Sequence, residues 1–84
     1  MSKIFVSVIA EHDREGNTKP LSIILGDGRK FSVDRILDVR MAAAMKAGGQ
    51  GIRYICRVHG KEIFLFNDEG KWFIESTAGE TGNK

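Results

Sequence analysis

Short apolar segments alternate with turn-forming residues along most of this chain. The apolar segments are rich in Val, Ile and Phe, which favour strands, and several of them alternate apolar and polar positions with a period of two. Gly, Asn and Asp between the segments favour tight turns. The pattern predicts six strands, at residues 4–12, 21–25, 29–40, 52–59, 62–67 and 71–76.

The longest predicted strand, residues 29–40, breaks its own alternation once. Its odd-numbered positions are mostly apolar and its even-numbered positions mostly polar, but Arg35 and Ile36 exchange the two kinds. A regular strand would place the Arg35 charge in the core, which is costly without a partner. A bulge or sharp bend near residues 34–36 would orient both side chains correctly, and bulges of this kind commonly mark barrel corners.

Glycines mark the predicted turns. Residues 26–28 are expected to close a tight hairpin, Gly60 and Lys61 a two-residue hairpin with Gly first, and residues 68–70 another turn. Residues 41–47 hold four alanines and two methionines, so they favour a helix but are too few to form a stable one alone. We expect one or two helical turns there, followed by a mobile connector at residues 48–51.

Six short strands, tight turns and one bent strand predict an all-β protein, a small six-stranded antiparallel barrel with at most one short helix. A barrel also removes the exposed edges that an open sheet would have. The 84 residues are expected to form one domain over residues 1–76 and a flexible tail over residues 77–84. The alternative is an α+β fold in which residues 41–47 form a true helix. The residues expected in the core are Val33, Leu37, Ile55 or Cys56, Leu65 and Trp72.

Positive charge is concentrated in the middle of the chain. Residues 29–61 carry eight Lys or Arg against two acids, and the rest carries five against nine, for a net charge of +2. A basic patch with Tyr54 or another aromatic ring nearby is what a nucleic-acid groove needs. The alternative is a solvated face paired with Glu11, Asp38, Glu62 or Glu69. The candidate residues for binding nucleic acid or a partner are Arg35, Arg40, Lys46, Arg53 and Arg57.

The sequence predicts no catalytic, metal or cofactor site. Residues 48–51 (GGQG) follow the helix-prone segment, so their amides cannot hold a phosphate at a helix N-terminus. Cys56 and His59 face opposite sides of a strand, and a zinc site needs about four ligands. Asp34 and Asp38 would lie roughly 13 Å apart on an extended strand, beyond the spacing of paired catalytic carboxylates. We therefore expect a protein that is not an enzyme.

Two motifs carry a resemblance to a known group of proteins. The bent segment VDRILD at residues 33–38 and the final hairpin ending WFIE at residues 72–75 resemble those of small uncharacterised bacterial proteins. The fold of that group is similar to the Sm-like and Src-homology-3-like barrels, and the likeness spans roughly residues 27–75. Some of these proteins are thought to accompany translesion DNA polymerases. The resemblance thus implies a small barrel that binds DNA, RNA or a DNA polymerase, and it implies no catalytic residue.

We expect a cytoplasmic protein that does not enter a membrane. Cys56 is the only cysteine, which excludes an internal disulfide and fits a reducing compartment. The apolar residues 4–10 are too few to span a bilayer and are followed at once by acids, so they favour a strand over a signal peptide.

A second functional class stays open, a protein-interaction adaptor or a homodimer. Met41, Ala44 and Met45, together with an exposed strand edge, would form its contact surface. Salt distinguishes the two classes, because binding to phosphates weakens steeply as salt rises and apolar association does not.

Overall fold

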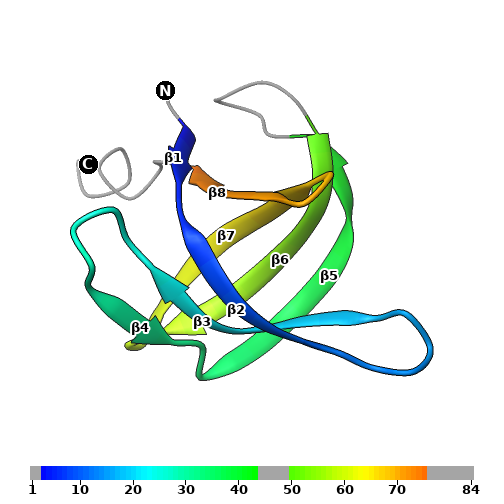
Figure 1. The fold of residues 1–84 in the computed structure, drawn as a ribbon, viewed down its shortest axis with the longest axis horizontal. Coiled ribbons are helices and arrows are strands. Elements are labelled where there is room, and N and C mark those ends of the chain that lie inside the picture. The colour runs from blue at the N-terminus through cyan, green and yellow to red at the C-terminus, as the bar shows by residue number, and fades with distance from the viewer. Residues whose placement is uncertain (1–2, 44–49, 76–84) are drawn as a thin grey trace.

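The computed structural model describes residues 3–43 and 50–75, and strands are its only regular elements there. They are β1 (Lys3–Phe5), β2 (Ser7–His12), β3 (Thr18–Ile24), β4 (Lys30–Ser32), β5 (Arg35–Ala43), β6 (Gln50–Val58), β7 (Lys61–Asp68) and β8 (Lys71–Glu75). One antiparallel sheet has five strands in the order β1-β8-β7-β6-β5, and the other has three in the order β2-β3-β4 (Figure 1). The all-β prediction is confirmed, and no helix occurs among the described residues.

The chain passes between the two sheets at two short bends. Val6 separates β1 from β2 and donates its main-chain N–H to the carbonyl of Trp72 at 3.1 Å. At the second bend, between β4 and β5, Asp34 donates its N–H to the carbonyl of Arg57 at 2.8 Å. Figure 1 shows β1 leading into β2 and β4 leading into β5 across these bends. Two of the predicted strands, residues 4–12 and 29–40, are therefore each divided between the two sheets.

A bulge in β5 sets the side on which its residues lie. The pairing of β5 with β6 shifts register between Ile36 and Asp38, so Leu37 is an extra residue. A bulge was expected at residues 34–36, and the irregularity lies one residue further on. Because of the extra residue, Ile36 packs against the core while Arg35 and Asp38 both point away from it. Leu37 itself is 39% exposed, so its predicted burial is wrong.

The two sheets pack against each other through one apolar core. Tyr54, Cys56 and Val58 of β6 and Leu65 of β7 contact Ile23 of β3, and all five side chains are buried. Alternate residues of β6 point toward this core because side chains alternate along a strand. Full burial of a side chain of this size contributes roughly 1.5–3 kcal/mol relative to exposure.

The residues expected in the core are buried to different degrees. Cys56 and Leu65 are 0% exposed, which confirms their predicted burial. Val33 and Trp72 are only partly buried, and both pack against the core. Ile55 lies on the other side of the five-stranded sheet, since it alternates with Cys56.

That other side, which we call the outer face because it is turned away from the three-stranded sheet, carries a second aromatic cluster. Phe66 and Phe73 are each 1% exposed and lie parallel with centroids 5.0 Å apart, and Phe64 packs against them. Phe5 meets Phe73 edge to face at 5.9 Å, and the Nζ atom of Lys3 lies 4.8 Å from the Phe73 centroid. The sheet therefore has apolar packing on both sides of β7 and β8.

The alanine-rich segment and the connector differ from expectation. Met41–Ala43 belong to β5, so the predicted helix is wrong over these three residues. Gly51 is a buried residue of β6 and not part of a mobile connector. Residues 44–49 and the predicted tail lie outside the described residues.

The hairpin turns also correct one prediction. The β6–β7 loop is His59–Gly60, one residue earlier than expected, and both have positive φ angles of 52° and 77°. The β7–β8 loop, Glu69–Gly70, repeats this geometry with φ angles of 53° and 88°. Two consecutive positive φ angles define the type I′ turn, whose twist matches that of a two-residue hairpin.

Gly51 permits a close approach of β6 to β7, which gives the first prediction. A Cβ atom at Gly51 would lie 2.6 Å from the carbonyl oxygen of Asn67 and 3.1 Å from the Cα of Asp68. Both are backbone atoms, so Gly51→Ala must displace a strand and should lower the free energy of unfolding by roughly 1–3 kcal/mol. Urea unfolding measures this change.

Gly26→Ala is the matched control, because a Cβ atom there meets nothing within 4 Å and no positive φ is required. Its unfolding free energy should stay close to that of the wild type or rise slightly. Equal stability of the two variants would contradict the packing described for Gly51.

Candidate nucleic-acid interface

Four of the five predicted basic residues lie on one face of one pair of strands. Arg35 of β5 is the direct cross-strand partner of Arg57 of β6, and Arg40 is the partner of Arg53. Directly opposed residues of an antiparallel pair project to the same side of the sheet. This is the outer face, since Arg53 and Arg57 alternate with the core residues of β6. Lys46, the fifth candidate, lies outside the described residues.

The bulge at Leu37 is what brings the two pairs together. Arg35 and Arg40 are five positions apart, so on a regular strand they would face opposite sides. The extra residue returns them to the same side, while the partners Arg53 and Arg57 need no such correction. Along β6 the two pairs are separated by four residues, or about 14 Å.

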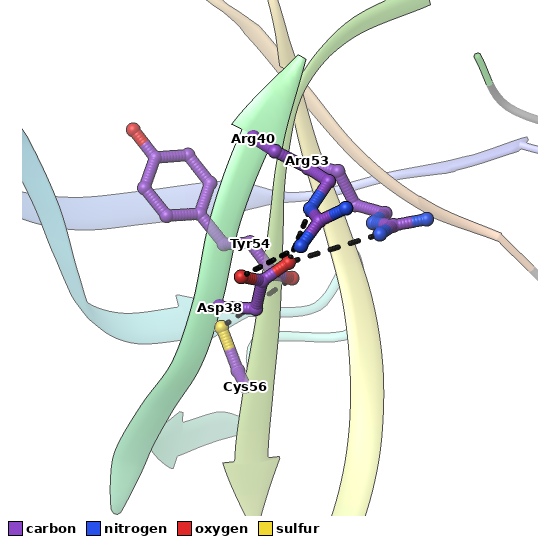
Figure 2. Close-up of polar contacts among 5 residues, drawn as sticks. All are labelled: Asp38, Arg40, Arg53, Tyr54 and Cys56. Atoms are coloured by element: carbon purple, nitrogen blue, oxygen red, sulfur yellow. Dashed lines mark hydrogen bonds and ion pairs between the residues drawn. The ribbon is translucent and has the colours of Figure 1, made fainter. Parts of the chain in front are cut away.

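Asp38 interacts with both arginines of one pair, Arg40 and Arg53. Its Oδ2 atom accepts a 2.7 Å hydrogen bond from Nε of Arg40, and its Oδ1 lies 3.4 Å from Nη2 of the same residue. Nη2 of Arg53 lies 3.9 Å from the same Oδ2 atom (Figure 2). The hydrogen bond from Arg40 lowers the pKa of Asp38, and it raises the pKa of Arg40 in turn. The Asp38 carboxylate thus interacts with two guanidinium groups.

Arg53 is the more enclosed member of that pair. Its side chain is 21% exposed, compared with 63% for Arg40. Its guanidinium carbon lies 5.1 Å from the centroid of the Phe64 ring, a cation–π arrangement. Its Nε atom is buried and makes no hydrogen bond among the described residues. Arg53 therefore combines a packing contact with an incompletely satisfied charge.

The pair of Arg35 and Arg57 has no such carboxylate. Both side chains are exposed, and neither forms an ion pair with the described residues. Asp34 is the nearest acid in sequence, but its Oδ2 atom accepts the main-chain N–H of His59 at 3.1 Å. Glu62 is the cross-strand partner of Arg57 on β7, without an ion pair between them. Two like charges directly opposite each other destabilise a sheet, so this pair favours an external anion.

Of the predicted aromatic partners, Tyr54 is wrong. Tyr54 is 2% exposed and points into the core, on the other side of the sheet from both guanidinium groups in Figure 2. Its burial raises its pKa. Among the described aromatic rings of the outer face, Phe5 is 59% exposed, while Phe66 and Phe73 are covered.

A row of cross-strand partners connects these groups, and sequence reasoning missed it. The row crosses all five strands of the larger sheet, from the arginine pair at β5 and β6 to the exposed ring at β1. The row can be recognised only when the registers of the hairpins are known. In order, its members are Arg40, Arg53, Phe66, Phe73 and Phe5.

Other chemistry finds little support in the described part of the chain. No group of three His, Cys, Asp or Glu side chains there could hold a metal ion. Cys56 is buried in the core while His59 is exposed in a turn. Over the described residues, no helix has the length and apolar character needed to cross a membrane. No family model, curated protein or solved structure matches this chain.

The buried thiol of Cys56 gives the second prediction. Burial raises its pKa from 9.0 to about 11, and its Sγ atom lies 3.8 Å from the carbonyl oxygen of Tyr54. The unfolded chain therefore loses this proton before the folded protein does, so stability is retained below about pH 9 and falls as the pH rises toward 11. The unfolding free energy should decrease by about 2 kcal/mol between pH 8 and 10.5 from this group.

Urea unfolding at several pH values measures the decrease, and Cys56→Ala provides the comparison. The variant is less stable at pH 8 because it leaves a cavity, but its stability should depend less on pH. The same dependence in both proteins would show that Cys56 does not titrate as described.

Proposed function

We propose that this protein binds nucleic acid, or an enzyme that acts on nucleic acid, through the outer face of β5 and β6, and that it is not itself an enzyme. The observation that carries the proposal is that two cross-strand arginine pairs share one face, and that among the described residues only the Arg40–Arg53 pair forms an ion pair with a carboxylate. Such an arrangement is unfavourable until an anion is bound. The buried free thiol of Cys56 fits a reducing compartment such as the cytoplasm.

We further propose that the two sheets form one six-stranded barrel. The argument counts β1 with β2, and β4 with β5, as single strands bent at Val6 and at residues 33–34. Each bent strand pairs with one neighbour in each sheet: β8 and β3 in the first case, β3 and β6 in the second. On this count every strand has a neighbour on each side over part of its length, although β5 itself pairs only with β6. A closed scaffold would hold β5 and β6 rigid and so keep the arginines in place.

The outer face of β5 and β6 is better suited to contacts with phosphates than to contacts with base edges. The arginines lie on the surface of a sheet, and no described element projects from it as a reading helix would. Phe5 is exposed but lies on β1, three strands away from β6. Phosphate contacts position a protein without distinguishing sequences. We therefore expect binding that depends strongly on salt and weakly on base sequence.

The third prediction tests the arginine pair that lacks a carboxylate. Arg35→Gln combined with Arg57→Gln should leave the fold intact, because exposed charges contribute little to stability. If the two side chains contact two phosphates, the slope of log K against log salt should become less negative by about 1.8 on duplex DNA or about 1.4 on single strands. Fluorescence anisotropy with labelled DNA and RNA at several salt concentrations measures the slope.

Arg14→Gln combined with Lys71→Gln is the matched control. It removes the same charge from exposed positions outside β5 and β6, one in the β2–β3 loop and one on β8. A similar loss of slope in both double variants would mean that binding follows net charge and not this face. Absence of wild-type binding at low salt would overturn the nucleic-acid proposal.

The fourth prediction concerns Asp38, which forms ion pairs with Arg40 and Arg53. Asp38→Asn removes the carboxylate from Arg40 and Arg53 and frees them for phosphate. Binding should become tighter, with a salt slope steeper by up to about 0.9 on duplex DNA. Asp27→Asn is the matched control, since Asp27 forms an equivalent 2.7 Å contact with Arg29 in the β3–β4 loop. Weaker binding by the Asp38 variant would contradict a competition between this carboxylate and phosphate.

One observation favours the second candidate, an adaptor or homodimer. Val39, Met41 and Ile52 are 51%, 69% and 37% exposed at the edge strand β5 and its neighbour β6. Ala44 and Met45, the other residues expected there, lie outside the described residues. Sedimentation at rising protein concentration distinguishes this candidate, because apolar self-association persists at high salt. Salt-resistant dimers that Met41→Glu abolishes would favour it over the nucleic-acid proposal.

A further inference from the structure

An apolar crevice of about 260 Å³ opens between the two sheets, near the His59–Gly60 turn. Its walls come from both sheets, so it lies on the inner side of the larger sheet, opposite the arginine pairs. The apolar side chains that line it are Ile23, Leu25, Phe31, Val58, Ile63 and Ile74.

Two basic side chains complete the lining, and no acid is part of it. Lys61 is exposed and forms no ion pair with the described residues. The ring of His59 meets Phe31 edge to face, with centroids 5.4 Å apart. The turn that carries His59 is fixed by the hydrogen bond from its main-chain N–H to Asp34. The crevice therefore combines apolar walls with basic groups at one end.

The size and chemistry of this space favour a small amphipathic ligand. It is larger than the voids of a packed core, which rarely exceed a water molecule. It is slightly smaller than the roughly 300–1,000 Å³ of common ligand pockets, so it would not hold a nucleotide cofactor. Water in an apolar space lacks hydrogen-bond partners, and an apolar group that displaces it binds favourably.

We propose that this crevice binds a small straight-chain monocarboxylate, with the chain between the sheets and the carboxylate at Lys61 and His59. The apolar walls select the chain, and the positive end selects the anion and fixes the direction of entry. A dianion or a polar ligand would leave charge against Ile23 and Val58, which is costly. This site is independent of the basic outer face, and either could fail without the other.

Titration of the full chain with octanoate, followed by ¹H–¹⁵N NMR, tests the proposal. Amide shifts should concentrate at the crevice residues and leave those of Arg35 and Arg53 unchanged. In a series from butanoate to decanoate, each added methylene should tighten binding by up to about fourfold until the crevice is full. Affinity that does not depend on chain length, or shifts spread evenly over the surface, would overturn the proposal.

Lys61→Gln tests the anionic end. Octanoate binding should weaken by about two- to fivefold, as expected for an exposed charge pair, while 1-octanol binding should not change. Lys71→Gln is the matched control, because Lys71 follows the Glu69–Gly70 turn as Lys61 follows His59–Gly60. Equal effects of the two substitutions, or wild-type binding of 1-octanol as tight as that of octanoate, would show that Lys61 does not hold a carboxylate.

Leu25→Trp tests the apolar walls by filling the crevice with an indole ring. Octanoate should then cause no shifts at Phe31 or Ile63, and the variant's NMR spectrum reports whether the fold is retained. Undiminished binding by a folded Leu25→Trp protein would contradict the location. If this variant does not fold, Lys61→Gln still decides the proposal, since Lys61 is exposed and outside the core.

Discussion

The extra residue in β5 is the constraint on which the outer face depends. Side chains of a strand alternate with a period of two, so one added residue moves everything beyond it to the opposite side. Leu37 is that residue, and it lets Ile36 reach the core while Arg35 and Arg40 share the outer face. Without the bulge, one arginine of β5 would point at Tyr54 and Cys56, where an unpaired charge is costly. The bulge thus separates an apolar interior from a charged exterior on the same strand.

The two bends between the sheets have a related effect. Val6 and residues 33–34 let two continuous stretches of chain contribute to both sheets, with main-chain hydrogen bonds that continue through the bends. The inner core then forms between the sheets, while Phe64, Phe66 and Phe73 cover part of the outer side. Because β6 and β7 are packed on both sides, Arg53 rests on a fixed surface at Phe64. Arg35 and Arg57 remain exposed beside this packed region.

Much of this could be predicted from the sequence, because alternation and glycine turns are local signals. The six apolar segments all contain strands, and the need for a bulge followed from the charge of Arg35. The extension of β5 through Ala43 was not visible, since alanine favours helices and only pairing with β6 overrides that preference. The His59–Gly60 turn was placed one residue late because Gly also fits the first position of a type II′ turn, whereas here Gly60 is the second residue of a type I′ turn. That error changes every partner between β6 and β7, so the row from Arg53 to Phe5 could not be found.

The central claim is that a polyanion binds on the outer face of β5 and β6. The most direct measurement is a titration of the ¹⁵N-labelled protein with a short DNA duplex, following main-chain amides and arginine Nε–H groups by NMR. The account predicts shifts at Arg35, Arg57 and Arg40 that shrink as salt is added, and small shifts at the Nε–H of Arg53, which is already enclosed. Shifts confined to Met41 and Ile52, or no shifts at low salt, would contradict it.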